Sequence, residues 1–373
     1  MSRHCKNSNP KSTISRRDFL RLAGVGAASL LVGSCQSQSP TSSPVAEPTG
    51  NISAQVAVSQ ARTYDRETIE KQVFEMIDGL GGLGDVVKSG DSVAIKTNLT
   101  GGVESGSLPG VEPVDSFVTH PEIVRALTIA VKAAGAAEIF IIEAVYEWES
   151  YRRWGYEEIA EDTGAILIDL NDSKPYNDFR EDPVGSGSFM YESFIFNPII
   201  NDIDVFMSVS KLKNHYLAGV THTMKNLYGL VPYRFYGLNE GDEYRSAFHG
   251  VEDETRNRLP RIIVDLNRAR PIDFGLIDGI KTTQGGEGPW IQTHSAIEPG
   301  LLVAGKNCVA TDTVATALMG HDPMGEYPNT PYVRCDNHLN IAASLGLGTN
   351  RLEEIEVVGQ PIETVKANFS PGW

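Results

Sequence analysis

The feature that most constrains this fold is a regular alternation of short apolar segments with longer amphipathic ones. The apolar segments have the length and composition of buried strands, and they lie at 52–58, 91–98, 138–144, 165–170, 204–210, 274–277, 301–303 and 355–358. The amphipathic segments carry apolar residues at helical spacing, at 66–80, 119–134, 150–163, 218–229, 254–270, 309–319 and 337–345. Strands that alternate with helices form βαβ units and parallel sheets. The sequence therefore predicts an α/β fold over 56–373, a mostly parallel sheet with flanking helices.

Local signals refine this α/β prediction. Asp65 is placed to cap the helix 66–80, and the run from Thr119 to Glu122 fits a capping box. Residues 172–200 show neither the strand nor the helix pattern of apolar residues, and we expect irregular structure or a short hairpin there. The break allows a division into two lobes, 56–171 and 172–373.

Residues 1–34 read as a signal peptide rather than as part of the fold. They carry six Lys or Arg residues against one acid, with an apolar run at 19–33 that is too short to span a bilayer. Ser15-Arg16-Arg17-Asp18-Phe19-Leu20 matches the twin-arginine pattern, and the alternative is a general secretory signal with an incidental Arg pair. We therefore expect the twin-arginine translocase to export the folded chain to the periplasmic side of the membrane.

A lipid attachment site is expected where the signal peptide ends. Val32-Gly33-Ser34-Cys35 resembles a lipobox, in which small residues precede the cysteine that is cleaved and acylated; alternatively, Cys35 merely lies near the cleavage site. Residues 35–55 are rich in Ser and Pro and read as a flexible tether. We expect a lipid on Cys35 to hold the exported domain at the membrane.

Charge and cysteine content exclude some classes of function. The formal net charge is −16, and removing 1–34 leaves about −21, which argues against nucleic acid as a partner. Cys308 and Cys335 remain after the signal and lipid cysteines, and the sequence leaves open a disulfide or two free thiols. An iron–sulfur cluster normally requires about four thiolates, so we expect none bound by this chain alone.

Polar residues gather where several expected strands end, and ligands of open α/β sheets bind beyond the carboxyl ends of the strands. Alternation along an extended backbone would put Lys211, Lys213 and His215 on one face, and such a cluster is costly without a balancing anion. The alternative is a set of solvated polar strand ends. The strand-end residues are Lys96, Thr97, Asn98, Glu143, Lys211, Lys213, His215 and Asp278.

Two further segments could close over the same site. The expected helix 218–229 has an apolar stripe opposite a polar face that carries Lys225 and Asn226, although a surface helix would show the same pattern. Glycines surround Glu287 in the loop 283–289, which also suits a plain turn. Asp312 lies in the first turn of the helix 309–319, where the helix dipole alone favours a carboxylate.

These residues define a candidate site for a small anionic ligand. Lysine and histidine can exchange protons or clamp an anion, and carboxylates can hold a divalent ion such as Mg²⁺ or Ca²⁺. The identity of any cofactor stays unknown at this stage. The catalytic candidates are Lys211, Lys213, His215 and Lys225; the substrate-binding candidates are Lys96, Thr97, Asn98, His120, Asn226 and Asp312; the metal candidates are Glu143, Asp278 and Glu287.

The chain resembles the bacterial and archaeal domain-of-unknown-function 362 family over most of 56–360, in the segments 91–98, 119–144, 211–231, 275–289 and 305–323. That family has no settled activity. Some of its members carry ferredoxin-like cysteine modules, and this chain has none, so the resemblance does not imply electron transfer.

A more distant likeness, to the nickel-pincer lactate racemase group, covers about thirty residues. It lies in the strand 204–210, His215, Ala218-Gly219 and Lys225. The likeness implies that His215 is an acid/base and that Lys225 holds a cofactor. Position 241 is Gly where the group has a metal-binding His, so a nickel pincer is not expected.

Three functions fit these observations. The first is an enzyme, isomerase-like or otherwise cofactor-dependent, that acts on a small carboxylate by Lys/His acid–base chemistry. The second is a lipid-anchored protein that captures an anionic solute or a metal, and the third is an assembly factor of the cell envelope.

Overall fold

The computed structural model describes residues 54–239, 244–251 and 254–372. The signal peptide, the twin-arginine pattern and the lipidation site at Cys35 lie outside the described residues. None of the helices in these ranges is long and apolar enough to cross a membrane. Cys308 is partly buried and Cys335 is buried, and both are free thiols.

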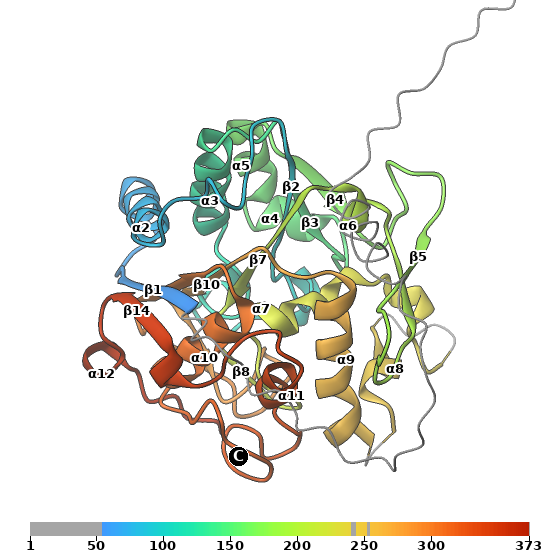
Figure 1. The fold of residues 1–373 in the computed structure, drawn as a ribbon, viewed down its shortest axis with the longest axis vertical. Coiled ribbons are helices and arrows are strands. Elements are labelled where there is room, and N and C mark those ends of the chain that lie inside the picture. Colours follow the sequence, from blue (N-terminus) through green and yellow to red (C-terminus); the bar gives the residue numbers. More distant parts are fainter. Residues whose placement is uncertain (1–53, 240–243, 252–253, 373) are drawn as a thin grey trace, which may run out of the picture. The chain divides into compact units, whose positions relative to one another are not determined.

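A mixed sheet of eight strands forms the centre of the domain (Figure 1). Five of its seven strand pairs are parallel, and β13 runs antiparallel to both of its neighbours. No helix separates β10 from β13 in sequence, and a connection of this kind favours antiparallel strands. The mostly parallel α/β prediction is confirmed. In spatial order the strands are β14 (Ile355–Gly359), β1 (Ala54–Gln60), β13 (Leu301–Gly305), β10 (Phe274–Gly279), β7 (Val205–Lys211), β2 (Ser92–Lys96), β3 (Glu138–Glu143) and β4 (Ile166–Asp169).

Helices cover both faces of this sheet. One layer contains α2 (Arg66–Gly79), α3 (Pro121–Ala133), α4 (Glu149–Arg153) and α5 (Tyr156–Thr163). The other contains α7 (His222–Lys225), α9 (Thr255–Ala269), α10 (Cys308–Leu318) and α11 (His338–Ser344). The remaining short elements are α6 (Ile199–Asp202), α8 (Ser246–His249), α12 (Ile362–Val365) and the hairpins β5 (Arg180–Pro183) with β6 (Ser193–Phe196), β8 (Asn214–His215) with β9 (Gly219–Val220), and β11 (Thr282–Gln284) with β12 (Ser295–Ile297).

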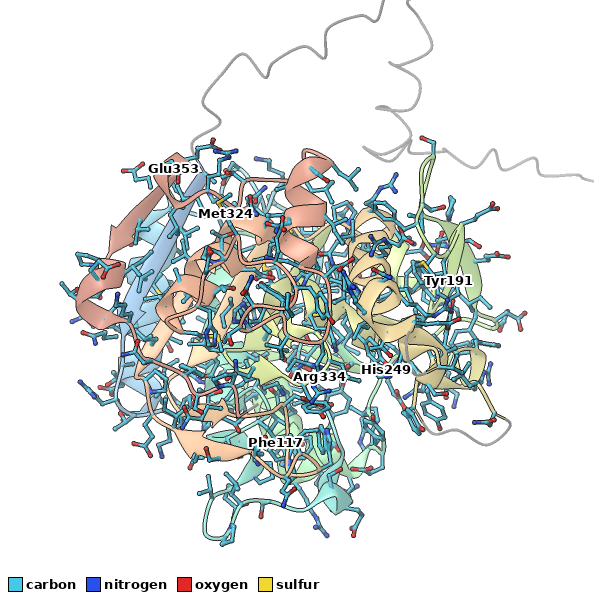
Figure 2. All side chains as sticks on the ribbon, turned by 90° about the horizontal axis from the view of Figure 1, so that it is seen from below. Phe117, Tyr191, His249, Met324, Arg334 and Glu353 are labelled. Carbon is cyan, nitrogen blue, oxygen red and sulfur yellow. The ribbon has the colours of Figure 1, made fainter. Side chains whose placement is uncertain are left out.

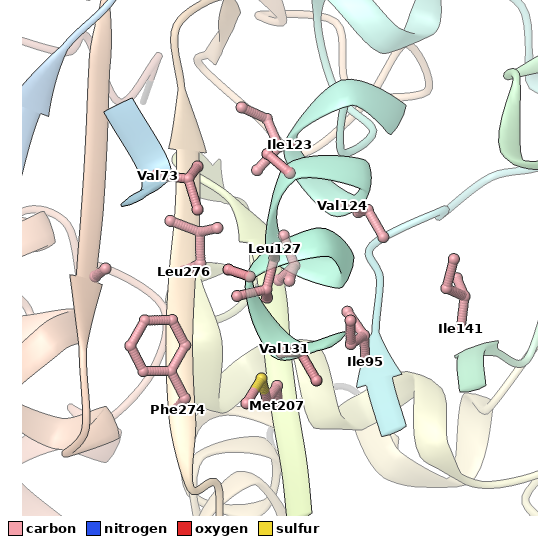
Figure 3. Close-up of a cluster of buried hydrophobic side chains, with 14 of the residues drawn as sticks. Val73, Ile95, Ile123, Val124, Leu127, Val131, Ile141, Met207, Phe274 and Leu276 are labelled. Carbon is pink, nitrogen blue, oxygen red and sulfur yellow. The ribbon is translucent and has the colours of Figure 1, made fainter. Parts of the chain in front are cut away.

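The central helix α3 shows why this sequence folds as layers. Its residues Val124, Leu127 and Val131 are fully buried and pack against apolar side chains of the sheet (Figure 3). Burial of each such side chain contributes about 1.5–3 kcal/mol. On β7, Met207 faces this helix whereas Phe206 belongs to the core on the opposite side of the sheet. Alternation along the strand therefore decides which helix layer each side chain meets.

Several local predictions are confirmed. Asp65 caps α2 by accepting a hydrogen bond from Thr68 N at 3.0 Å. The segment 172–200 contains the expected hairpin, β5–β6. The two possible lobes stay a prediction; β2 and β7, one from each, pair directly in the sheet.

Three local predictions are wrong. The capping box does not form, because His120 rather than Thr119 caps α3, with its Nδ1 accepting from Glu122 N. The helix expected at 150–163 is divided into α4 and α5 at Gly155, whose φ is 79°. The helix expected at 218–229 is a hairpin strand, one turn of α-helix and a 3-10 helix at Asn226–Leu230. Positive φ at Gly219 and at His222 (43°) interrupts a continuous helix there.

Candidate functional site

A cavity of about 620 Å³ lies beyond the carboxyl ends of β2 and β3, where ligands of α/β sheets bind. Figure 2 labels His249, one of the residues at this cavity. Seven sequence-predicted residues line it and are brought together by the fold. They are Lys96, Asn98, Glu143, His215, Lys225, Asn226 and Glu287.

Lys96 and Glu143 form a buried ion pair in the cavity wall. Their Nζ and Oε1 atoms are 2.7 Å apart, and Glu143 also accepts hydrogen bonds from Leu99 N and Ala144 N at 3.0 Å each. Burial lowers the pKa of Lys96, and the charge of Glu143 opposes this shift. A Cβ on Gly229 would overlap Glu143 Oε1, so only glycine leaves room for the pair at this position.

Two amide side chains connect this pair to the sheet. Asn98 Nδ2 donates to Asn226 Oδ1 at 3.0 Å, and Asn226 Nδ2 donates to Ser208 Oγ at 3.0 Å. Lys96 Nζ also lies 3.4 Å from Asn226 Oδ1. These contacts join β2, β7 and the 3-10 helix, and they fix the floor of the cavity.

Glu287, on the loop after β11, is held by two donors. Its Oε2 accepts from Tyr216 N at 2.8 Å, and its Oε1 accepts from Trp290 Nε1 at 3.1 Å. His215 Nδ1 lies 3.8 Å from Oε2. The two carboxylates among the described lining residues, Glu143 and Glu287, are therefore already engaged by groups of the protein.

Lys225 and Arg245 have no carboxylate partner among the residues that the structure describes. Lys225 Nζ lies 4.1 Å from the centre of the Tyr228 ring, and its side chain makes no hydrogen bond or ion pair there. Arg245 Nε donates to Val231 O at 2.6 Å, while its buried Nη2 lacks an acceptor. Both residues are more than nine-tenths buried, at 7% and 4% exposure, so within the described part of the chain these two cations are poorly compensated.

Burial also shifts proton affinities in the cavity. It lowers the pKa of Lys225 to about 8, helped by Arg245 and Lys96 and opposed by Glu287 and Glu143. Burial and the charge of Lys225 lower the pKa of His215 well below its usual range and that of His249 to about 4. At neutral pH these imidazoles are neutral. His215 Nδ1 accepts from Leu217 N at 3.2 Å, which leaves the ring proton on Nε2.

Lys211 does not reach the cavity. Lys96 pairs in register with Ser208, so Lys211, three residues further along β7, points to the opposite face of the sheet. There Lys211 Nζ lies 2.8 Å from Asp278 Oδ2, and Tyr64 donates to Asp278 Oδ1 at 2.8 Å. His120 stacks on Tyr64 with ring centres 3.6 Å apart, and its backbone N donates to Asp278. We call Lys211, Asp278, Tyr64 and His120 the closed network.

Lys213 and Thr97 lie beside the cavity without lining it. Lys213 Nζ donates to Phe117 O at 2.5 Å and to Glu287 O at 3.2 Å, and burial lowers its pKa well below the usual range. The buried Thr97 Oγ1 has no hydrogen-bond partner among the described residues. The expected face of Lys211, Lys213 and His215 is thus dispersed, because the strand ends at Lys211.

Asp312 acts at a distance from the cavity. From α10 it accepts hydrogen bonds from Thr223 N and Met224 N at 2.9 Å each and from Thr223 Oγ1 at 2.5 Å. Burial raises the pKa of Asp312 to about 7 in spite of these donors. The carboxylate anchors the start of α7, directly before Lys225, and Asp312 itself does not line the cavity.

The three metal candidates are not assembled into one site. Glu143 contacts Lys96, Asp278 belongs to the closed network, and Glu287 accepts from Tyr216 and Trp290. No group of three or more His, Cys, Asp and Glu side chains within the described ranges is arranged to hold a metal ion.

Sequence reasoning missed part of the lining. Arg245 is the N-cap of α8 and His249, four residues later, is its last residue, a spacing that puts them on one face. That spacing was an available signal, whereas the aromatic residues were not distinguishable from core. The missed lining residues include Tyr146, Tyr228, Tyr244, Arg245, His249 and Trp290.

Comparisons with known proteins agree with this architecture only at the level of family. Thylakoid-associated protein sll1697 of Synechocystis sp. (strain ATCC 27184 / PCC 6803 / Kazusa) is 26% identical over 268 residues, which cover 72% of this chain and 75% of that protein. A crystal structure of a Thermotoga maritima protein aligns with a TM-score of 0.36 and 11% identity over 62% of this chain and 54% of its own, about half its length. That alignment is too weak to bear on fold or function.

The likeness to the nickel-pincer lactate racemase group is not confirmed by these comparisons. The model of the family described as "Domain of unknown function (DUF362)" matches residues 93–317, which include the strands, loops and short helices that build the cavity. This chain belongs to the DUF362 family.

Proposed function

We propose that this protein is an exported, membrane-tethered enzyme that binds a small carboxylate in the cavity and acts on it by lysine acid–base chemistry. The observation that carries the proposal is the pair of buried cations, Lys225 and Arg245, without a carboxylate partner in the described chain. Buried charges are normally paired, because an uncompensated one costs several kcal/mol. An anionic ligand would supply the missing partner.

A carboxylate suits these two groups. A guanidinium presents planar donors that match two carboxylate oxygens, and an ammonium adds a point charge. Lys96, although close, is already paired with Glu143 at 2.7 Å and is not needed for the ligand. The Nε2–H of His215 offers a further donor, because the Nδ1 atom is occupied by Leu217 N.

Lys225 is the group best suited to transfer protons. Its pKa of about 8 lies close to neutral pH, where a catalytic acid or base works best. His215 has a strongly lowered pKa and a fixed neutral tautomer, which suits a hydrogen-bond donor that orients the substrate. In this proposal Lys225 exchanges the proton and His215 and Arg245 position the carboxylate.

Export and anchoring rest on the N-terminal sequence. The twin-arginine pattern at Arg16-Arg17 and the lipobox before Cys35 support delivery and acylation. The name of the Synechocystis relative, a thylakoid-associated protein, is compatible with a membrane-linked location. Palmitate labelling of the expressed chain should be lost in Cys35→Ser, and labelling that persists would contradict the anchor.

Calorimetric titration of the full chain with sodium acetate tests the anion site. Lys225→Met and Arg245→Gln should each weaken binding about tenfold or more, since hydrogen bonds to charged groups contribute about 1.5–3 kcal/mol. Lys281→Met is the matched control, because Lys281 pairs with Asp115 outside the cavity and should not affect binding. Wild-type affinity in both cavity variants would refute the proposal.

A tethered capture protein is the second candidate. Lys225 has a pKa of about 8, and a group that titrates near neutral pH serves capture of an anion as well as turnover. Deuterium exchange at the carbon next to the carboxylate, followed by NMR in deuterated buffer, separates the two. Exchange that Lys225→Met abolishes supports the enzyme, and a ligand recovered without exchange supports capture.

A further inference from the structure

We infer that the carboxylate ligand carries a planar aromatic ring system, which lies against the aromatic outer wall of the cavity. The inference rests on the proposed function, because the anionic end of the ligand is placed at Lys225 and Arg245. The first observation is size. A cavity of about 620 Å³ falls in the range of about 300–1,000 Å³ that encloses drug-sized molecules, far larger than a two- or three-carbon acid requires.

The second observation is that the cationic and the aromatic lining residues of the cavity differ in burial. Its cations are buried, at 7% exposure for Lys225 and 4% for Arg245. Its most exposed lining residues are all aromatic: Tyr146, Tyr244 and Trp290, at 39%, 50% and 45%. A ligand with a charged end and a flat apolar end would satisfy both regions at once.

The Trp290 side chain is held in place by several contacts and is not an incidental surface residue. Its indole Nε1 donates to Glu287 Oε1 at 3.1 Å, and its ring meets Phe117 edge-on at 5.8 Å. The ring also packs so closely on Gly101 and Gly288 that a Cβ at either position would overlap it. Three contacts of different kinds therefore fix the indole, which is still 45% exposed.

The aromatic wall continues inward to the cations. Tyr228 lines the cavity, with Lys225 Nζ at 4.1 Å and the Arg245 guanidinium at 5.7 Å from its ring centre. Aromatic rings attract one another in stacked and edge-on arrangements, so a ring attached to the bound carboxylate would find favourable surfaces from Tyr228 outward. A saturated ring of equal size would gain burial but not this orientation-dependent term.

Titration calorimetry of the full chain with four acids tests the inference: acetate, cyclohexanecarboxylate, benzoate and 2-naphthoate. We expect 2-naphthoate to bind about a hundredfold tighter than acetate, because of its larger apolar surface. Benzoate should bind at least about threefold tighter than cyclohexanecarboxylate, because only the aromatic ring stacks. Equal affinity for acetate and 2-naphthoate would overturn the inference and leave the anion site intact.

Variants of two exposed tryptophans localise the effect. Trp290→Leu should weaken 2-naphthoate at least about fivefold, and weaken it more than it weakens acetate. Trp148→Leu is the matched control: Trp148 is 42% exposed and also donates to a glutamate, Glu157, but it does not line the cavity. Tyr146→Leu provides a second wall variant if Trp290→Leu unfolds.

The outcomes separate the two proposals. Equal weakening of acetate and 2-naphthoate in Trp290→Leu and Tyr146→Leu would overturn the aromatic wall, as would unchanged 2-naphthoate binding in both. Absence of binding by all four acids to the wild-type chain would refute the anion site itself and the inference with it.

Discussion

Buried cations lie near the carboxyl ends of the parallel strands on opposite faces of the sheet. The two sites differ in whether a carboxylate of the described chain pairs with the buried charge. In the closed network, Lys211 has Asp278 at 2.8 Å, and that carboxylate also accepts from Tyr64 and from the backbone N atoms of His120 and Ile280. In the cavity, Lys225 and Arg245 have no carboxylate within the described chain. Within the described residues the first arrangement has a partner for its buried charge, whereas the second has none.

The difference shows how to distinguish structural from functional charges in this molecule. Burial lowers the pKa of Lys211 and of Lys225 alike, so a shifted pKa does not separate them. The presence of a satisfied partner does. Buried pairs that are complete serve the fold, and a buried cation that opens onto a cavity without a partner points to a ligand.

The largest expected effect comes from breaking the closed network. Asp278→Asn leaves Lys211 as an uncompensated buried cation, and loss of one partner from a buried pair costs about 3–5 kcal/mol. Urea unfolding followed by circular dichroism should show this loss in the free energy of unfolding. Acetate binding by the fraction that remains folded should stay close to that of the wild type, because the network faces away from the cavity.

Lys225→Met is the matched variant on the other face. It removes a buried charge without leaving a carboxylate behind, so its free energy of unfolding should equal or exceed that of the wild type. If Lys225→Met is as destabilising as Asp278→Asn, the distinction between the two groups fails.

The second prediction concerns pH. Lys225 has a folded-state pKa of about 8, so its charge is present at pH 7 and mostly absent at pH 9, and acetate affinity should fall about tenfold over that interval. The charged groups that set this pKa are Glu287, Arg245, Lys96 and Glu143. Calorimetry at both pH values should show the decrease in the wild type and a flat profile in Lys225→Met.

Stability should move in the opposite direction. The folded-state pKa lies below the ordinary value of 10.5, so between pH 8 and 10.5 the unfolded chain binds more protons at Lys225 than the folded chain does. The contribution of Lys225 to the free energy of unfolding therefore increases as the pH rises through this window.

A wild-type affinity for acetate that does not change from pH 7 to pH 9 would show that Lys225 does not hold the anion.

Much of the fold was predictable from the sequence, because the spacing of apolar residues that marks a strand or a helix is a local property. The segment 204–210 is mostly apolar, and from Val205 onward it forms the central strand β7, Val205–Lys211, in which every residue is buried. The segment 218–229 also has an apolar stripe, yet it is not one helix, because Gly219 and His222 adopt positive φ and Asp312 anchors the chain from α10. The spacing of apolar residues within one segment does not reveal such long-range contacts.

The site was predictable in part for a similar reason. Polar residues at the strand ends were visible in the sequence, and four of them meet in the cavity: Lys96, Asn98, Glu143 and His215. Which face they share depends on strand register, and Lys96 opposite Ser208 sends Lys211 to the closed network. Register is a property of two strands together, so a single stretch of sequence could not assign Lys211 and Lys225 to different faces.

The smallest expected effect tests whether an ion pair must be buried, as well as paired, to contribute strongly to the free energy of unfolding. Lys281 and Asp115 form an ion pair at 3.3 Å beside the closed network, with about a third of each side chain exposed. Exposed pairs contribute about 0–1 kcal/mol, because water screens the attraction and two long side chains lose freedom. Lys281→Met should therefore lower the free energy of unfolding by less than about 1 kcal/mol, measured in the same urea titration as Asp278→Asn. If it costs as much as Asp278→Asn, then proximity of opposite charges, rather than the completeness of a buried network, stabilises this face of the sheet.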